Sequence, residues 1–193
     1  MTFKHDSQKN PAADTAVSRR RFLQVGLGIS TSIAMPNAFA SLLTQPERKL
    51  SLLNLHTGES LNATYWAEGQ YQTSELDAIN RILRDHRTGD VYHMDNDLID
   101  MLNILHHKMN GRQPFHVISG YRSPKTNTKL NKQSNGVAKK SLHMQGKAID
   151  IRLPGRQLAE LRKASLNLHI GGVGYYPTSD FIHIDTGRVR HWG

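Results

Sequence analysis

Residues 141–150 read SLHMQGKAID, and this stretch decides how the second half of the chain folds. The run around Asp150 predicts a strand over 147–153, and His143 lies in the loop just before it. Gly146 allows the backbone to turn from the loop into the strand, because glycine adopts positive φ without a steric penalty. The stretch therefore predicts one histidine and one carboxylate at a loop-to-strand turn.

A second histidine, His183, lies in the stretch FIHID (residues 181–185), which predicts another strand. Two histidines and one carboxylate form a suitable ligand set for a catalytic Zn²⁺, which keeps a fourth position for water. Bound Zn²⁺ lowers the pKa of that water to about 7, so that no protein nucleophile is needed. Spacing alone leaves alternatives open. Each histidine can be a polar group on a half-buried strand, and Asp150 can pair with a nearby Arg or Lys.

The composition narrows the class of protein further. The chain has 193 residues, with 25 Lys and Arg, 16 Asp and Glu, 11 His and no Cys. The length suits one domain with a core of its own. The absence of cysteine excludes a disulfide scaffold, a zinc ribbon, a thioredoxin-like redox site, a cysteine hydrolase and an iron–sulfur protein. The net charge of +9 comes without the long Lys/Arg blocks typical of nucleic-acid binding, so we expect no nucleic-acid partner.

The N-terminal part of the chain has the features of an export signal. Residues 18–24 read SRRRFLQ, a twin-arginine pattern, and they precede a moderately apolar run over 25–34 and the small-residue site AFA at 38–40. The apolar run is shorter than the roughly 18 apolar residues expected of a membrane-spanning helix. We therefore expect a twin-arginine signal peptide over 1–40, export to the periplasm, and a mature domain over 41–193 without stable membrane insertion. A basic disordered tail is the alternative.

Residue patterns elsewhere predict strands and helices in the order of an α+β protein. A hairpin is predicted over residues 45–69. A helix is predicted to begin near Thr73 or Ser74, with Ser74 and Asp77 spaced as a capping box, and to end near Thr88 and Gly89. The glycine-rich stretch GGVG (171–174) predicts close backbone packing beside a substrate cleft rather than a phosphate loop. The other predicted elements are helices over 96–109, 124–131 with Ser123 as N-cap, and 156–165, and a strand over 115–119.

The pattern S-x-H-x-x-G-x-A-x-D over 141–150, with a later histidine at 183, resembles the zinc-binding pattern of the zinc D-Ala-D-Ala peptidase family, peptidase family M15. The stretch SGYRS at 119–123 resembles the arginine-bearing segment that precedes the first ligand in that family. The likeness spans nearly the whole mature chain and implies a small antiparallel sheet with flanking helices, the hedgehog-like fold of these peptidases. Further stretches resemble its murein endopeptidase branch, at 52–60, 136–141, 171–177, 183–187 and 191–192.

The resemblance implies a role for each matching side chain. His143, Asp150 and His183 would be the zinc ligands, and Arg122 would lie over the fourth coordination site. There a fixed positive charge would stabilise the oxyanion that forms when water attacks the scissile carbonyl. For Arg122 the alternative is a surface arginine after a turn.

Two carboxylates are candidates for the general base. In the dipeptidase branch an acidic residue lies three residues before the last histidine ligand, and Asp180 has that place here. Asp185 projects to the same strand face as His183, since strand side chains alternate, and it could be the base or could orient that imidazole. We favour Asp180 for its reach to the water. Ser141 is expected to hydrogen-bond within its loop rather than act as a nucleophile.

These observations together imply a zinc-dependent murein endopeptidase, which hydrolyses 3-3 links, 4-3 links or both in peptidoglycan through a metal-activated water. Its partners would be stem peptides, whose carboxylates suit a basic surface, and it would act as a monomer. Two alternatives stay open. One is a D,D- or L,D-carboxypeptidase that trims stem peptides, and the other is a zinc module that binds the cell wall without catalysis.

Overall fold

The structure of the chain, a computed structural model, describes residues 45–134 and 136–193. The predicted signal peptide over 1–40 lies outside the described residues. Within the part of the chain that the structure describes, no helix has the length and apolar character needed to cross a bilayer.

A long β-hairpin begins the sheet, as predicted. β1 (Glu47–Asn54) pairs antiparallel with β2 (Ser60–Ala67), and Gly58 lies in the turn between them with φ of +73°. The short β3 (Gln70–Tyr71) extends the hairpin at its outer edge. Alternate residues of β1 are buried, so Leu50 and Leu52 face the core, with buried polar residues at either end of that face.

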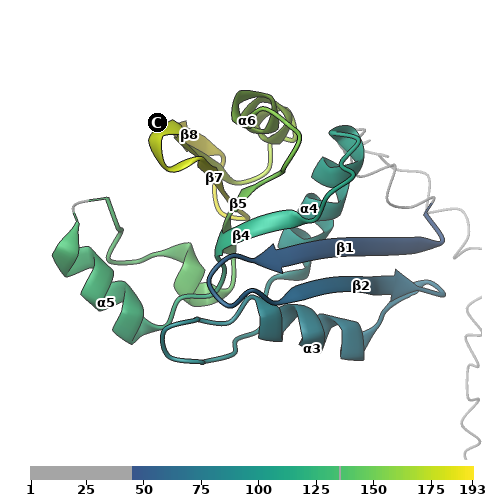
Figure 1. Ribbon diagram of the computed structural model, residues 1–193, viewed down its shortest axis with the longest axis horizontal. Helices are drawn as coiled ribbons and strands as arrows, with labels where there is room; N and C mark the ends of the chain where they lie inside the picture. The colour runs from purple at the N-terminus through teal and green to yellow at the C-terminus, as the bar shows by residue number, and fades with distance from the viewer. Residues whose placement is uncertain (1–44, 135) are drawn as a thin grey trace, which may run out of the picture. The chain divides into compact units, whose positions relative to one another are not determined.

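The described strands form one mixed sheet of eight, in the order β3-β2-β1-β4-β5-β7-β6-β8 (Figure 1). β1 and β4 are parallel, as are β6 and β8. The sheet is therefore larger than the predicted small antiparallel sheet and is mixed, because five neighbouring pairs are antiparallel and these two are parallel. Two helices separate β1 from β4 along the chain, and a long crossover of this kind allows a parallel pair. The remaining strands are β4 (Phe115–Ser119), β5 (Ala148–Arg152), β6 (Gly172–Tyr176), β7 (Phe181–Asp185) and β8 (Arg190–Trp192).

Four α-helices of the described residues flank the sheet, and α5 projects away from the strands (Figure 1). The start of α5 is as predicted. The side chain of Ser123 accepts a hydrogen bond from the backbone N–H of Thr126, and Pro124 occupies the first turn. The four helices are α3 (Thr73–Ile82), α4 (Asn96–Lys108), α5 (Pro124–Gln133) and α6 (Leu158–Leu166).

Helix α3 begins at Thr73, as predicted, but its cap and its C-terminal end differ from the prediction. It begins after Gln72, whose side chain makes no capping hydrogen bond, so the predicted capping box at Ser74 is wrong. It ends at Ile82 rather than near Gly89. The carbonyl of Ile82 accepts a hydrogen bond from the side chain of Asn54 on β1 at 2.8 Å, so a tertiary partner replaces the next helical turn.

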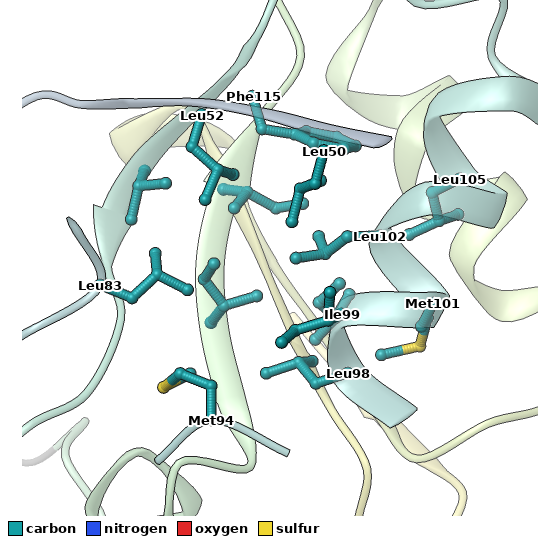
Figure 2. Packing of buried hydrophobic residues seen from close by; sticks show 14 of the residues in the cluster. Leu50, Leu52, Leu83, Met94, Leu98, Ile99, Met101, Leu102, Leu105 and Phe115 are labelled. Atoms are coloured by element: carbon teal, nitrogen blue, oxygen red, sulfur yellow. The ribbon is translucent and has the colours of Figure 1, made fainter. Parts of the chain in front are cut away.

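The apolar core lies between the sheet and α4 (Figure 2). Each fully buried side chain of this kind stabilises the fold by about 1.5–3 kcal/mol relative to its exposed state. This packing fixes the positions of the central strands. The helix buries its predicted face, Leu98, Ile99, Leu102 and Leu105, and the strands contribute Leu50, Leu52 and Phe115.

One face of the sheet carries a row of positions across four neighbouring strands. Asp150 on β5 is the direct partner of His183 on β7. His183 is in turn the partner of Gly174 on β6, and Gly174 is the partner of Trp192 on β8. Direct partners point to the same face of a sheet. The register therefore places a carboxylate, an imidazole and an indole on one face.

Candidate metal centre

His143 reaches this face from a short 3₁₀ helix, η1 (Leu142–Gln145). The hydroxyl of Ser141 accepts a hydrogen bond from the backbone N–H of His143 at 3.3 Å, as expected of a loop residue. Gly146 ends the turn with φ of +67°, and a Cβ here would collide with the carbonyl of His93. The predicted turn at Gly146 is thus confirmed, and it allows His143 to approach β5.

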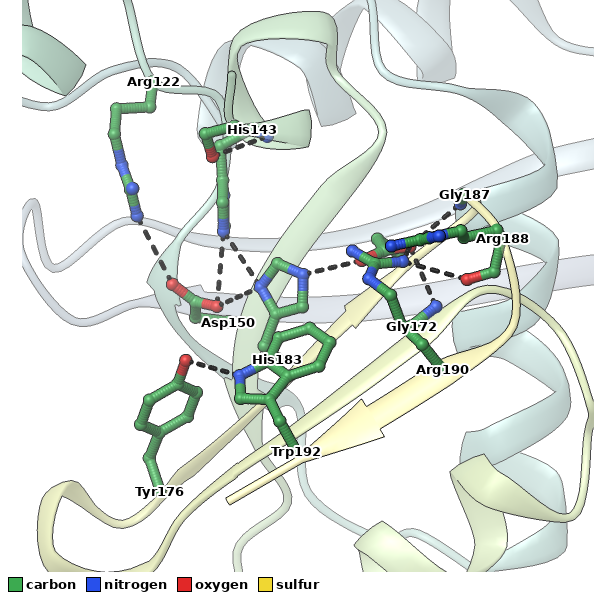
Figure 3. Close-up of polar contacts among 12 residues, drawn as sticks. Arg122, His143, Asp150, Gly172, Tyr176, His183, Gly187, Arg188, Arg190 and Trp192 are labelled. Carbon is green, nitrogen blue, oxygen red and sulfur yellow. Dashed lines mark hydrogen bonds and ion pairs between the residues drawn. The ribbon is translucent and has the colours of Figure 1, made fainter. Parts of the chain in front are cut away.

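Three potential ligand atoms converge at this point (Figure 3). The Nδ1 of His183 lies 2.9 Å from the Oδ1 of Asp150. The Nε2 of His143 lies 3.2 Å from that nitrogen and 3.3 Å from that oxygen. Ligands bound at about 2.0–2.1 Å to a tetrahedral zinc lie about 3.3–3.4 Å from one another. The three atoms are therefore within about half an ångström of the spacing around one such ion.

The other ring nitrogen of each histidine already has an acceptor. The Nδ1 of His143 lies 2.7 Å from the carbonyl oxygen of Gly120, and the Nε2 of His183 lies 3.0 Å from a carboxylate oxygen of Asp185. Both of these nitrogens donate, so in the neutral imidazoles the two facing nitrogens both carry lone pairs. They cannot bond each other without a proton or a cation between them. Histidine ligands of metals commonly have this outer hydrogen bond, so the residues fit a bound cation.

Electrostatics at the centre also favour a positive charge. Burial lowers the pKa of His183, but its hydrogen bonds to Asp150 and Asp185 outweigh burial and raise that pKa to about 9. Burial raises the pKa of Asp150, but the neighbouring imidazoles, His143 first, outweigh it and hold that pKa well below its usual range. A divalent cation can take the place of the extra proton, as metal binding commonly releases protons from its ligands.

Asp185 is occupied by hydrogen bonds on both oxygens and has no exposed surface. One oxygen accepts from the backbone N–H groups of Gly172 and Gly187 at 2.8 and 2.9 Å. The guanidinium of Arg190 binds both oxygens, at 3.1 and 2.7 Å, and the second oxygen also contacts His183. This arrangement fixes the imidazole of His183 and keeps the carboxylate away from solvent.

Asp180 lies in a different environment. It follows η2 (Pro177–Ser179) with φ of +52°, directly before β7. Its side chain is 60% exposed and accepts a hydrogen bond from Arg152 at 2.6 Å. It is not among the residues that line the cleft over the three converging side chains. Of the two candidate bases, one therefore lies behind His183 and the other contacts solvent.

Arg122 follows β4 and lies beside Asp150. Its Nη2 is 3.6 Å from the carboxylate of Asp150 and donates to the hydroxyl of Ser119 at 3.3 Å. The backbone N–H of Arg122 donates to the carbonyl of His143 at 3.2 Å and so joins the two loops. The side chain is 11% exposed, and its Nε has no hydrogen-bond partner among the described residues. A buried guanidinium with an unpaired N–H suits an anionic group of a ligand.

A cleft of about 500 Å³ opens over the three converging side chains. Among the described residues that line it, Asp150 is the one carboxylate. Cationic and aromatic side chains face it, so the lining suits a ligand that carries carboxylates. These side chains are Arg122, Lys140, Arg190, Tyr176, Phe181 and Trp192.

Sequence reasoning assigned no role to Arg190 and Trp192, which lie on the unpredicted strand β8. The alternating glycines of β6 are the signal that could have found them. A Cβ at Gly172 would lie 2.5 Å from the guanidinium of Arg190, and one at Gly174 would lie 2.6 Å from the indole of Trp192. The predicted close packing at these glycines is thus confirmed, and side chains from β8 fill the space.

The sequence matches known proteins over most of its length. A family model described as peptidoglycan L,D-endopeptidase MepK matches residues 43–192. The protein named peptidoglycan L,D-endopeptidase MepK in Escherichia coli K12 is 44% identical over 176 residues, which cover 91% of this chain and 97% of the relative. A protein of the same name in Shigella flexneri gives the same values. In Haemophilus influenzae, a protein named probable peptidoglycan L,D-endopeptidase MepK is 39% identical over 178 residues, 91% of this chain and 95% of the relative.

Proposed function

The chain belongs to the family described as peptidoglycan L,D-endopeptidase MepK, within the M15 peptidases, and on this premise we propose that it is a zinc-dependent murein endopeptidase. It hydrolyses peptide cross-links of peptidoglycan, either 3-3 links, 4-3 links or both. The observation that carries the proposal is the convergence of His143, Asp150 and His183, whose ligand atoms lie 2.9 to 3.3 Å apart. Each histidine has its other nitrogen occupied by an acceptor.

These three residues hold the cation in the proposal. Zinc suits two imidazoles and one carboxylate, and it keeps a fourth position open. When bound, the ion supplies Lewis acidity, which polarises a carbonyl and lowers the pKa of water. The carbonyl of Gly120 and the carboxylate of Asp185 keep the two imidazoles in orientation, and Asp185 is thus a positioning residue.

Arg122 and Asp180 have the two other catalytic roles in the proposal, oxyanion stabilisation and general base. The guanidinium of Arg122 holds its charge beside Asp150, where the scissile carbonyl oxygen becomes negative, and a fixed donor of this kind contributes about 100-fold or more to kcat. Asp180 is the general base in this proposal, because its carboxylate is open to solvent whereas that of Asp185 is fully enclosed. Asp180 does not line the cleft, so it has to leave Arg152 and turn toward the ligands before it takes a proton from water and passes it to the leaving amine.

The proposed substrate also indicates the compartment in which the enzyme acts. We propose export through the twin-arginine pathway, removal of residues 1–40, and action of the mature domain, 41–193, as a monomer in the periplasm. Stem peptides of peptidoglycan carry carboxylates, which suit the cationic side chains of the cleft, Arg122 and Lys140 among them.

Digestion of isolated sacculi, followed by mass spectrometry of the muropeptides, tests this function. Zinc-loaded protein is expected to convert cross-linked dimers to monomers, and a chelator is expected to stop the conversion. The dimers that disappear identify the link. Two results contradict the proposal. Loss of terminal residues alone would indicate a carboxypeptidase, and binding of sacculi without any release would indicate a wall-binding module.

A further inference from the structure

Tyr176 lies in the cleft at the end of β6. It is the direct partner of Phe181 on β7, and the two rings stack with centroids 4.6 Å apart and planes 20° apart. Phe181 and His183 point to the same face of β7, so Tyr176 lies on the face that carries the converging ligands. Figure 3 shows its hydroxyl end directed toward Trp192.

The hydroxyl of Tyr176 accepts one hydrogen bond, and its own proton is not donated to any acceptor among the described residues. The Nε1–H of Trp192 donates to the Tyr176 oxygen at 2.8 Å, and an indole N–H acts only as a donor. Within residues 45–134 and 136–193, no acceptor takes a hydrogen bond from this hydroxyl. The hydroxyl proton of Tyr176 is therefore available to a ligand in the cleft.

Trp192 is held so that its N–H keeps a fixed direction. The glycine at 174 allows the indole to lie directly on β6, since a Cβ there would come within 2.6 Å of the ring. The ring centroid lies 5.3 Å from that of His183, and the guanidinium of Arg190 lies 5.1 Å from it. The indole therefore has little freedom, and it orients the hydroxyl of Tyr176.

We propose that Tyr176 is a further catalytic residue, whose hydroxyl donates a hydrogen bond to the scissile carbonyl oxygen as that oxygen becomes negative. The inference rests on the proposed function. Arg122 and Tyr176 both line the cleft over the ligands, and in the proposal one substrate oxygen bound there receives a hydrogen bond from each. The hydroxyl proton stays on Tyr176, so no bond to it breaks and no further reactant is needed. Trp192 is a positioning residue, which acts through Tyr176.

Tyr176→Phe tests this role because it removes the hydroxyl and keeps the stacked ring. Tyr175→Phe is the matched control. Tyr175 is the partner of Ile182 and points to the other face, where its ring lies 4.8 Å from the guanidinium of Arg162. Trp192→Phe removes the N–H and keeps an aromatic ring. The assay measures kcat and KM on a soluble cross-linked muropeptide dimer, the zinc content per chain, and the affinity for a phosphinate analogue of the scissile peptide.

Tyr176→Phe is expected to lower kcat by about 100-fold, with KM and zinc content near the wild-type values and weaker binding of the phosphinate. Trp192→Phe is expected to give a smaller fall in kcat, and Tyr175→Phe none. A kcat of Tyr176→Phe within twofold of an active wild type would overturn the inference and leave the proposed function intact. An effect on KM alone would also overturn it. A wild-type protein that cleaves no dimer would instead refute the proposed function, and this inference with it.

Discussion

Asp150 on β5 and His183 on β7 are direct cross-strand partners, and their side chains meet at 2.9 Å. Two of the three converging ligand atoms are thus placed by the register of the sheet. A shift of one residue would turn either side chain to the opposite face. His143 alone comes from a loop, and the turn at Gly146 determines its approach. The centre therefore depends on one strand pairing and one glycine.

His143→Ala is expected to remove both bound zinc and hydrolysis of sacculi, because two ligands hold a cation far more weakly than three. His107→Ala, an exposed histidine of α4, is the control and is expected to keep both. Zinc content measured by elemental analysis, together with release of muropeptides, checks this. Full zinc occupancy in His143→Ala would place the cation elsewhere.

Asp185→Asn is expected to lower the affinity for zinc by about 10- to 100-fold, because outer partners of histidine ligands contribute this much. The amide keeps the shape of the side chain but loses the charge that faces the Nε2 of His183. Competition with a chromogenic chelator measures the change. An affinity within twofold of wild type would mean that Asp185 does not act through His183.

Asp180→Asn is expected to keep zinc and to lower kcat by about 100-fold, as the loss of a general base does. Arg152→Gln frees the carboxylate of Asp180 from its partner and is expected to retain activity. Steady-state kinetics on a soluble dimer distinguishes the two variants. If Asp180→Asn turned over at the wild-type rate, the base would have to be another group, and Asp185 is too enclosed to replace it.

Gly174→Ala is expected to displace the indole of Trp192, since the new Cβ would come within 2.6 Å of the ring. In a Trp66→Phe background, Trp192 is the remaining tryptophan, so a shift in its fluorescence emission reports the movement. Gly136→Ala is the control, because its Cβ would meet nothing closer than 4.0 Å. If Gly174→Ala left both the emission and kcat unchanged, the contact between β6 and β8 would be needed neither to position Trp192 nor for turnover.

The elements that the sequence predicts well have strong local patterns. The face of α4 and the cap of α5 follow from apolar spacing and from Ser123-Pro124, and the structure contains both. The strands β6 and β8 could not be predicted from such patterns. Strand β6 is glycine-rich, and β8 has only three residues and lies at the edge of the sheet. The early end of α3 depends on Asn54, which is distant in sequence.

The same distinction holds at the candidate site. His143, Asp150 and His183 stand out because their types and spacing form a metal-binding pattern, and the structure brings them together. The carbonyl of Gly120 that orients His143 has no signature in the sequence, since any residue offers a carbonyl. The partners of Asp185 come from backbone groups and from the unpredicted β8. Contacts of this kind become visible only once the strands are paired.

Anomalous diffraction at the zinc edge, from crystals of the zinc-loaded protein, tests the shared cation most directly. We expect one ion per chain at about 2.0–2.2 Å from the Nε2 of His143, the Nδ1 of His183 and a carboxylate oxygen of Asp150. An active enzyme whose ion lies elsewhere, or binds His183 through its Nε2, would contradict this expectation.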